Sequence, residues 1–221
     1  MEEFTIVQKI AVWALPLLFA ITLHEVAHGW VASFFGDQTA RLAGRLSFNP
    51  IRHIDIVGTI ILPLIMLTLG GFIFGWAKPV PVDQRNMQHP RVGMIFVAIA
   101  GPLMNILMAV LWALIAKLGM NLTGNYSWFG VPLMYMGQVG IMINIVLGVL
   151  NCLPIPPLDG WRVIANLLPG RVAWHAFKFE QLGFLVLVVL LVTGVLAYVI
   201  MPPISWLMNI ITSLFGLGAL Y

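Results

Sequence analysis

Two histidines and a glutamate lie within an otherwise apolar stretch near the amino terminus of the chain. His24, Glu25 and His28 occur in the sequence ITLHEVAHGW. Residues four apart lie on one face of a helix, so both imidazoles can bind one metal ion while the glutamate addresses a water molecule on that ion. The spacing therefore predicts a Zn²⁺ site with His24 and His28 as ligands and Glu25 as the general base of a hydrolytic reaction.

The apolar surroundings of this motif strengthen the metal interpretation. A single histidine in an apolar helix is commonly a neutral core residue that donates to a carbonyl group. Two histidines at helical spacing with a glutamate between them are different, because ionisable groups inside a bilayer are costly and usually mark function.

The composition indicates an integral membrane protein. Apolar residues make up 61% of the 221 residues, charged residues make up 9%, and the mean hydropathy is +0.99. A soluble fold could not bury that much apolar surface. The net charge of +3 is spread without a long basic run, which excludes a nucleic-acid partner. Cys152 is the single cysteine, so an internal disulfide is impossible.

Apolar segments that could cross the lipid bilayer recur along the chain, and a span needs about 20 residues. The first segment continues directly into the histidine motif, so it is expected to be an uncleaved anchor. We expect a single all-α, polytopic membrane domain over residues 1–221 with five to six transmembrane helices. The segments cover residues 4–35, 56–74, 92–116, 131–153, 182–201 and 203–220.

Segment 56–74 is the ambiguous one, because glycines and a proline interrupt it. If all six segments span, the two sides carry seven and four lysines and arginines; if 56–74 is re-entrant, they carry nine and two. Cationic residues prefer cytoplasmic loops, so the sharper asymmetry favours a re-entrant or extended element between the first and second true spans. The loop containing Lys78 is the alternative re-entrant part. The amino terminus then lies outside and the active site lies nearer the cytoplasmic side. The nine cytoplasmic cations would be Arg41, Arg45, Arg52, Lys78, Arg85, Arg91, Arg162, Arg171 and Lys178.

A hydrolytic zinc site has three protein ligands and one open position. Asp159 is the favoured third ligand. The prolines of NCLPIPPLDG forbid a regular helix just before it, and an irregular backbone at membrane depth is tolerated only around a cavity or in contact with protein. The alternative role for Asp159 is an N-cap of the following short helix. Asp55, together with His53, is the second choice of ligand. The other candidates are Asp83, His89, Cys152, His175 and Glu180.

Four strings together resemble the site-2 protease family of intramembrane metalloproteases, in particular its compact bacterial and archaeal members. HEVAH at 24–28 matches the His-Glu-x-x-His helix of the family, and NCLPIPPLDG at 151–160 resembles its Asn-x-x-Pro-x-x-x-Leu-Asp-Gly signature. AGPLMN at 100–105 and GWAKPVPV at 75–82 are similar to two further family segments. The resemblance covers residues 20–160.

The resemblance implies that His24, His28 and Asp159 bind zinc, that Glu25 is the general base, and that Asn151 holds substrate or the developing oxyanion. It implies an intramembrane zinc metalloendopeptidase of a prokaryotic cell membrane. Such an enzyme cleaves single-span membrane-protein substrates in or near their transmembrane segments, in regulated intramembrane proteolysis. The catalytic core would cover about 4–160, followed by variable helices at about 180–221.

Two residue roles stay open at this stage. Asn151 could instead pack between helices, since Asn144 lies seven residues earlier on the same face and Asn105 could meet both; packing is the preferred role of those other two. The prolines around Val80 and Val82 predict an extended segment, which could pair with substrate by strand addition or could be a stiff turn between helices.

Two other functional classes compete with the protease. A membrane transporter of protons or metal ions would also place polar residues in spans, and a non-catalytic membrane adaptor could keep a decayed motif. Glu25 argues against the transporter, because its place between the histidines is needed to activate water but not for conduction. The intact set of His24, Glu25, His28 and Asp159 argues against the adaptor. The chain also lacks the inverted internal repeats typical of transporters.

Overall fold

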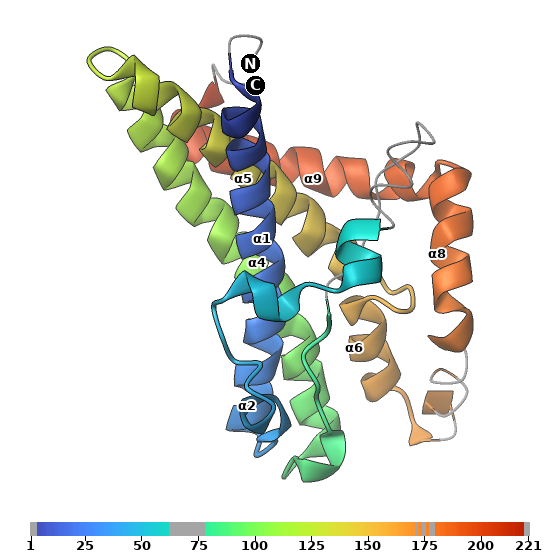
Figure 1. Ribbon diagram of the computed structural model, residues 1–221. Helices are drawn as coiled ribbons and strands as arrows, with labels where there is room; N and C mark the ends of the chain where they lie inside the picture. Colours follow the sequence, from blue (N-terminus) through green and yellow to red (C-terminus); the bar gives the residue numbers. More distant parts are fainter. Residues whose placement is uncertain (1–3, 62–77, 171, 174–175, 177–179, 219–221) are drawn as a thin grey trace.

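A computed structural model describes residues 4–61, 78–170, 172–173, 176 and 180–218 of the chain. Every regular element in this described part is helical (Figure 1). Among the described residues, four helices are long and apolar enough to cross a membrane: α1 (Ile6–Phe34), α4 (Pro90–Leu122), α5 (Ser127–Asn151) and α9 (Val195–Leu214). The expected all-helical polytopic architecture is confirmed, while the division into a catalytic core and variable helices stays a prediction.

Helix α1 begins at a capping box. The Thr5 hydroxyl accepts from the Gln8 N–H at 3.3 Å, and the Gln8 side-chain oxygen accepts from the Thr5 N–H at 3.0 Å. These bonds satisfy main-chain donors that a helix start leaves free. The helix ends where Gly36 adopts a φ of 105°, which a side chain would disfavour. The histidine motif at 24–28 therefore lies within one continuous helix.

Helices α4 and α5 pack closely because small residues face each other. A Cβ on Gly137 would lie 2.5 Å from the main-chain nitrogen of Ala116, and a Cβ on Gly119 would lie 2.4 Å from that of Met134. Such small residues let two backbones approach closely in a membrane. Asn105 and Asn144 are fully buried between these helices and are hydrogen-bonded at 3.0 Å, which confirms the predicted packing role.

The chain between α1 and α4 starts and finishes at the same end of the helix bundle. The Gln88 N–H, just before α4, donates to the Phe35 carbonyl at 3.0 Å, just after α1. The segment between the two helices therefore begins and ends on one side of the bundle. Much of segment 56–74 lies outside the described residues, so its path stays a prediction. Short helical turns flank that gap: α2 (Thr39–Leu42), η1 (Pro50–His53), η2 (Ile56–Ile61) and η3 (Gln84–Asn86).

A buried carboxylate holds this returning segment against the end of α1. Asp37 is 0% exposed and accepts hydrogen bonds from the Thr39 N–H at 3.0 Å, the Asp83 N–H at 2.7 Å and the Asn86 amide at 3.1 Å. Burial alone would raise the pKa of Asp37, but the bonds from Thr39, Asp83 and Asn86 hold that pKa below its usual value.

The carboxyl-terminal helices break at a different residue from the one expected. The sequence predicted separate apolar segments at 182–201 and 203–220, with the boundary at residue 202. Instead α8 (Gly183–Val192) is only ten residues long and α9 continues through Pro202 and Pro203. The break lies at Gly194, whose φ of 76° is easily adopted without a Cβ. At about 15 Å, α8 is too short to cross a hydrocarbon layer of about 30 Å alone. Figure 1 shows α9 crossing α1 at a steep angle.

Candidate metal centre

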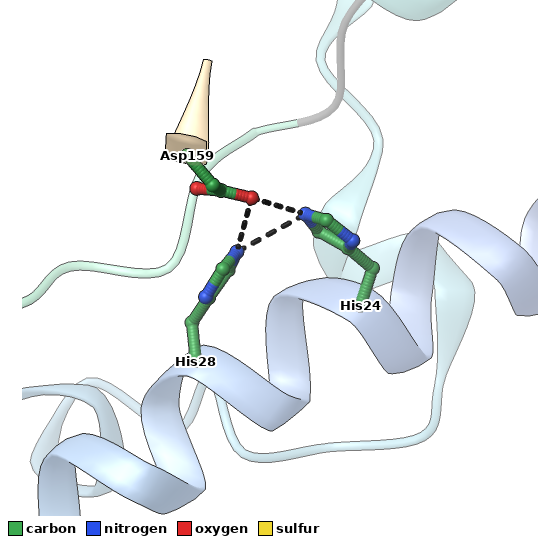
Figure 2. A group of neighbouring side chains, drawn as sticks. All are labelled: His24, His28 and Asp159. Atoms are coloured by element: carbon green, nitrogen blue, oxygen red, sulfur yellow. Dashed lines mark hydrogen bonds and ion pairs between the residues drawn. The ribbon is translucent and has the colours of Figure 1, made fainter. Parts of the chain in front are cut away.

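Three side chains from two distant parts of the chain meet in the interior (Figure 2). His24 and His28 lie on one face of α1, each 8% exposed, and their Nε2 atoms are 3.0 Å apart. Asp159 is the first residue of α6 (Asp159–Leu167) and is equally buried. Its Oδ2 atom lies 3.1 Å from Nε2 of His24 and 3.3 Å from Nε2 of His28.

The proline-rich turn after α5 delivers Asp159 to the histidines. Helix α6 begins almost against the end of α5, because a Cβ on Gly160 would lie only 2.3 Å from the Cys152 carbonyl oxygen. Leu158 occupies the cap position of α6, and no side chain there caps the helix. Asp159 is therefore not the N-cap, so that alternative is wrong, and its carboxylate is directed to the histidine pair (Figure 2).

The far nitrogens of both imidazoles are fixed by α4. His28 Nδ1 lies 2.6 Å from the Val97 carbonyl, which can only accept, so this nitrogen carries the proton. His24 Nδ1 lies 2.6 Å from Oδ1 of Asn105. The orientation of that amide is set by its nitrogen, which donates to the Ala20 carbonyl at 3.3 Å and to Oδ1 of Asn144 at 3.0 Å. His24 Nδ1 is therefore also the protonated nitrogen.

This tautomer assignment makes the site suitable for a cation. With Nδ1 protonated, each ring in its neutral form presents the lone pair of its Nε2 to the other ring and to Oδ2 of Asp159. That carboxylate oxygen is buried and receives no hydrogen bond. The three ligand atoms all lie within 4.8 Å of one another. Two imidazole nitrogens and one carboxylate oxygen form a donor set that Zn²⁺ accepts, and histidines bonded through their far nitrogens are typical of zinc sites.

A glycine on α4 makes room for both rings. A Cβ on Gly101 would lie 2.5 Å from Cε1 of His24 and 2.5 Å from both Cε1 and Nε2 of His28. Side-chain carbons are not found that close to other atoms. Any larger residue here would push the imidazoles from their positions, so the Gly-Pro of AGPLMN has a direct steric role at the site.

Glu25 is half-buried on α1, next to His24. Its Oε2 atom accepts a hydrogen bond of 2.7 Å from the main-chain N–H of Val80. Residues 78–83 are non-helical, and no strand is formed in this described segment. The pairing of Val80 and Val82 with a substrate strand therefore stays a prediction.

Asn151 is the last residue of α5 and lies beside the ligand-bearing turn. Its side-chain nitrogen donates to the Leu147 carbonyl of its own helix at 3.0 Å. The residue also lines an apolar cavity of about 760 Å³, together with Pro102 and Gly160, which neighbour Gly101 and Asp159 in the chain. The side chains of Asn105 and Asn144 are hydrogen-bonded to each other, whereas the side-chain amide of Asn151 is hydrogen-bonded within its own helix.

The remaining ligand candidates that the structure describes lie elsewhere. The ring nitrogen Nε2 of His53 is 3.0 Å from the Ser47 carbonyl, and Asp55 accepts from the Gly58 N–H at 2.7 Å. Asp83 pairs with Arg85 at 2.7 Å, and this guanidinium lowers the pKa of Asp83 to about 2.

The other candidates also stand apart from the histidine pair. Glu180 precedes α8 in the turn η4 (Glu180–Leu182), 3.8 Å from Arg162. His89 precedes the first residue of α4, and Cys152 lines the apolar cavity. His175 lies outside the described residues.

Sequence reasoning missed three contributors to this site. Asn105 orients His24, Gly101 accommodates both rings, and the Val80 N–H binds Glu25. Two signals were available: an asparagine in an apolar helix, since a polar residue at membrane depth usually marks function, and the segment AGPLMN, which contains both Gly101 and Asn105. The main-chain donor of Val80 left no signal in residue types.

Comparison with known proteins agrees with this geometry. Residues 12–131 match the family model described as Peptidase family M50. The "Putative zinc metalloprotease YwhC" of Bacillus subtilis is 40% identical over 86% of this chain and 84% of its own length. The "Putative zinc metalloprotease Rip2" of Mycolicibacterium smegmatis is 30% identical over 81% of this chain and 66% of its own length. None of the solved structures matches the chain.

Proposed function

The chain belongs to peptidase family M50, and from this premise we propose that it is an intramembrane endopeptidase that cleaves membrane-protein substrates in or near their spanning segments. Its family uses zinc, and the long apolar helices in the described part of the chain mark it as an integral membrane protein. One observation carries the proposal: three lone-pair donors converge in the membrane-spanning bundle, with a glutamate beside them.

The roles divide among four side chains. His24, His28 and Asp159 would hold the ion, which when bound supplies a Lewis acid that activates water and polarises a peptide carbonyl. Glu25 takes a proton from the attacking water and returns it to the leaving amine. Asn105 and the Val97 carbonyl keep both ligand rings in the required tautomer.

Asn151 is proposed as a donor to the developing oxyanion. It lies at the end of α5, and its amide uses one of two hydrogens for Leu147, which leaves the other for substrate. One such donor contributes about 3 kcal/mol to the transition state. Asn151→Ala is therefore expected to lower kcat about 100-fold with little change in KM. A variant with unchanged kcat would assign Asn151 to packing alone.

The proposed substrates are single-span membrane proteins, including membrane-tethered regulators that cleavage would release. A peptide bond inside a helix is shielded, so the substrate span must unwind before attack. His28 lies six residues before the end of α1, about 9 Å along the helix axis. Arg41, Arg45 and Arg52 follow that end, so we place the active site nearer the cytoplasmic side. Labelling of single cysteines introduced into this loop, from either side of sealed vesicles, tests the orientation.

Glu25→Gln tests the general base directly. The variant is expected to retain zinc, because the three ligands are untouched, and to cleave a single-span reporter 10²- to 10⁴-fold more slowly. Glu180→Gln is the matched control, since that carboxylate lies outside the site and should leave cleavage unchanged. Cleavage by Glu25→Gln at the wild-type rate would refute the general-base role.

A further inference from the structure

Glu25 differs from the other site residues in how it is held. The two histidines are oriented by α4, whereas the Glu25 carboxylate is bonded by a main-chain group of the non-helical segment 78–83. The distance of 2.7 Å from Val80 N to Oε2 of Glu25 is at the short end for N–H···O bonds.

The sequence around Val80 makes this donor singular. Pro79 and Pro81 have no N–H, so Val80 is the one residue among these three that can donate from its main chain. Because a residue before proline is restricted to extended conformations, the direction of that N–H is also restricted. Pro79, Val80 and Pro81 thus present a single donor on a stiff stretch of chain.

Close packing presses this stretch onto α1. Val80 is 7% exposed, and a Cβ on Gly29 would lie 2.9 Å from its Cγ1 atom. Gly29 is four residues after Glu25, so both lie on the same face of the helix. The glycine allows the segment to approach α1 directly, at the height of the glutamate.

Both ends of the segment are anchored independently. The Lys78 N–H donates to the His53 carbonyl at 2.9 Å, and the Lys78 carbonyl accepts from Arg45 at 2.8 Å. At the other end the Asp83 N–H donates to the buried Asp37 at 2.7 Å. The position of the Val80 donor is therefore set by the fold and does not depend on Glu25.

We infer that the main-chain N–H of Val80 is a positioning group for Glu25: it holds the carboxylate in the orientation that reaches the attacking water. The inference rests on the proposed function, in which Glu25 is the general base. A free glutamate side chain samples several rotamers, and misplacement of a reacting group by about 1 Å can lower the rate about 100-fold. The donor would thus act on kcat, with no contact to the ion.

Val80→Pro removes the donor while keeping an apolar residue at a position already restricted to extended backbone. We expect kcat on the single-span reporter to fall 10- to 100-fold, with KM within about twofold and zinc content unchanged. Val82→Pro removes an N–H of the same segment that is not bonded to Glu25, so it is the matched control in a binding measurement with a hydroxamate. Val80→Ala keeps the donor and should keep kcat.

A binding measurement separates this inference from the proposed function. A small hydroxamate such as acetohydroxamate chelates zinc after giving its proton to a neighbouring carboxylate, so its affinity reports the placement of Glu25 without turnover. We expect both Val80→Pro and Glu25→Gln to weaken acetohydroxamate binding about tenfold or more, and Val82→Pro to leave it unchanged. If Val80→Pro fails to fold, replacing the Val80 amide by an ester removes the same hydrogen.

Three results would overturn the positioning role. They are wild-type kcat and hydroxamate affinity in Val80→Pro or in the ester, equal losses of hydroxamate affinity in Val80→Pro and Val82→Pro, and a loss confined to KM, which would assign the segment to substrate binding. A wild-type protein that cleaves no reporter, yet shows the hydroxamate pattern, would refute the proposed function and leave the positioning role supported.

Discussion

Gly101→Ala should displace the zinc ligands without altering any ligand. The new Cβ would lie 2.5 Å from ring atoms of His24 and His28, whereas ordinary contacts begin at 3.4 Å. The rings or α4 must therefore move by about 1 Å, while a zinc site tolerates only about 0.2 Å in its ligand distances. Neither ring can turn away freely, since Asn105 and Val97 hold the far nitrogens at 2.6 Å.

We expect Gly101→Ala to lower zinc affinity 10- to 100-fold, the range seen when the support of metal ligands is removed, and to cost about 1–3 kcal/mol of stability through overpacking. Zinc affinity is measured by competition with a chelator in detergent, and stoichiometry by metal analysis. Gly148→Ala is the control, because a Cβ there would meet its nearest atoms at 3.4 Å. Wild-type zinc affinity in Gly101→Ala, or an equal loss in Gly148→Ala, would refute the steric reasoning.

Three further substitutions test other parts of the structure. Asn105→Leu removes the acceptor of His24 Nδ1 and should lower zinc affinity 10- to 100-fold in the same chelator competition, while ligand identity is unchanged. Asp37→Asn should lower the free energy of unfolding by roughly 2 kcal/mol at pH 7, measured by denaturation in mixed micelles, because a buried carboxylate loses charge-assisted hydrogen bonds. The pKa of Asp37 is lower in the folded state than in the unfolded state. The stabilisation by this carboxylate is therefore fully present above the unfolded-state pKa of about 4 and is lost as the pH falls through the folded-state pKa. The stability deficit of Asp37→Asn should accordingly shrink below about pH 4, and a deficit that stays constant would contradict this linkage. Gly194→Ala forces a side chain onto a φ of 76° and should cost about 1 kcal/mol in the same denaturation assay with zinc content unchanged, whereas a loss of zinc would connect this break to the metal centre.

The histidine motif was readable from the sequence because its geometry is local. Helical periodicity alone places His24 and His28 on one face, and the cost of charge in a bilayer marks them as functional. Asp159 was reachable by a different route: few ligand types occur in this chain, and the prolines before Asp159 require an irregular segment that must be covered by protein.

The break between α8 and α9 was misplaced because two local signals competed. Pro202 and Pro203 are stronger helix breakers in water than Gly194, yet α9 passes through both of them and begins directly after the glycine, which is its N-cap. Within a membrane protein, neighbouring groups can satisfy the carbonyls that a proline leaves free, so prolines are tolerated inside helices. Residue types alone did not indicate whether the helix would break at the prolines or at the glycine.

By itself the sequence determined that this chain is an apolar helical membrane protein, and it predicted a zinc-binding histidine pair with a glutamate on one helix, since these properties follow from composition and from a repeat of 3.6 residues. Only the tertiary structure showed that the Asp159 carboxylate lies against both histidines, that Asn105 and Gly101 fix the rings, and that a main-chain N–H of Val80 binds Glu25. Those contacts join segments far apart in the chain, so packing decides which residues meet. The donor to Glu25 is moreover a backbone N–H, which every residue except proline carries, so its residue type could not identify it.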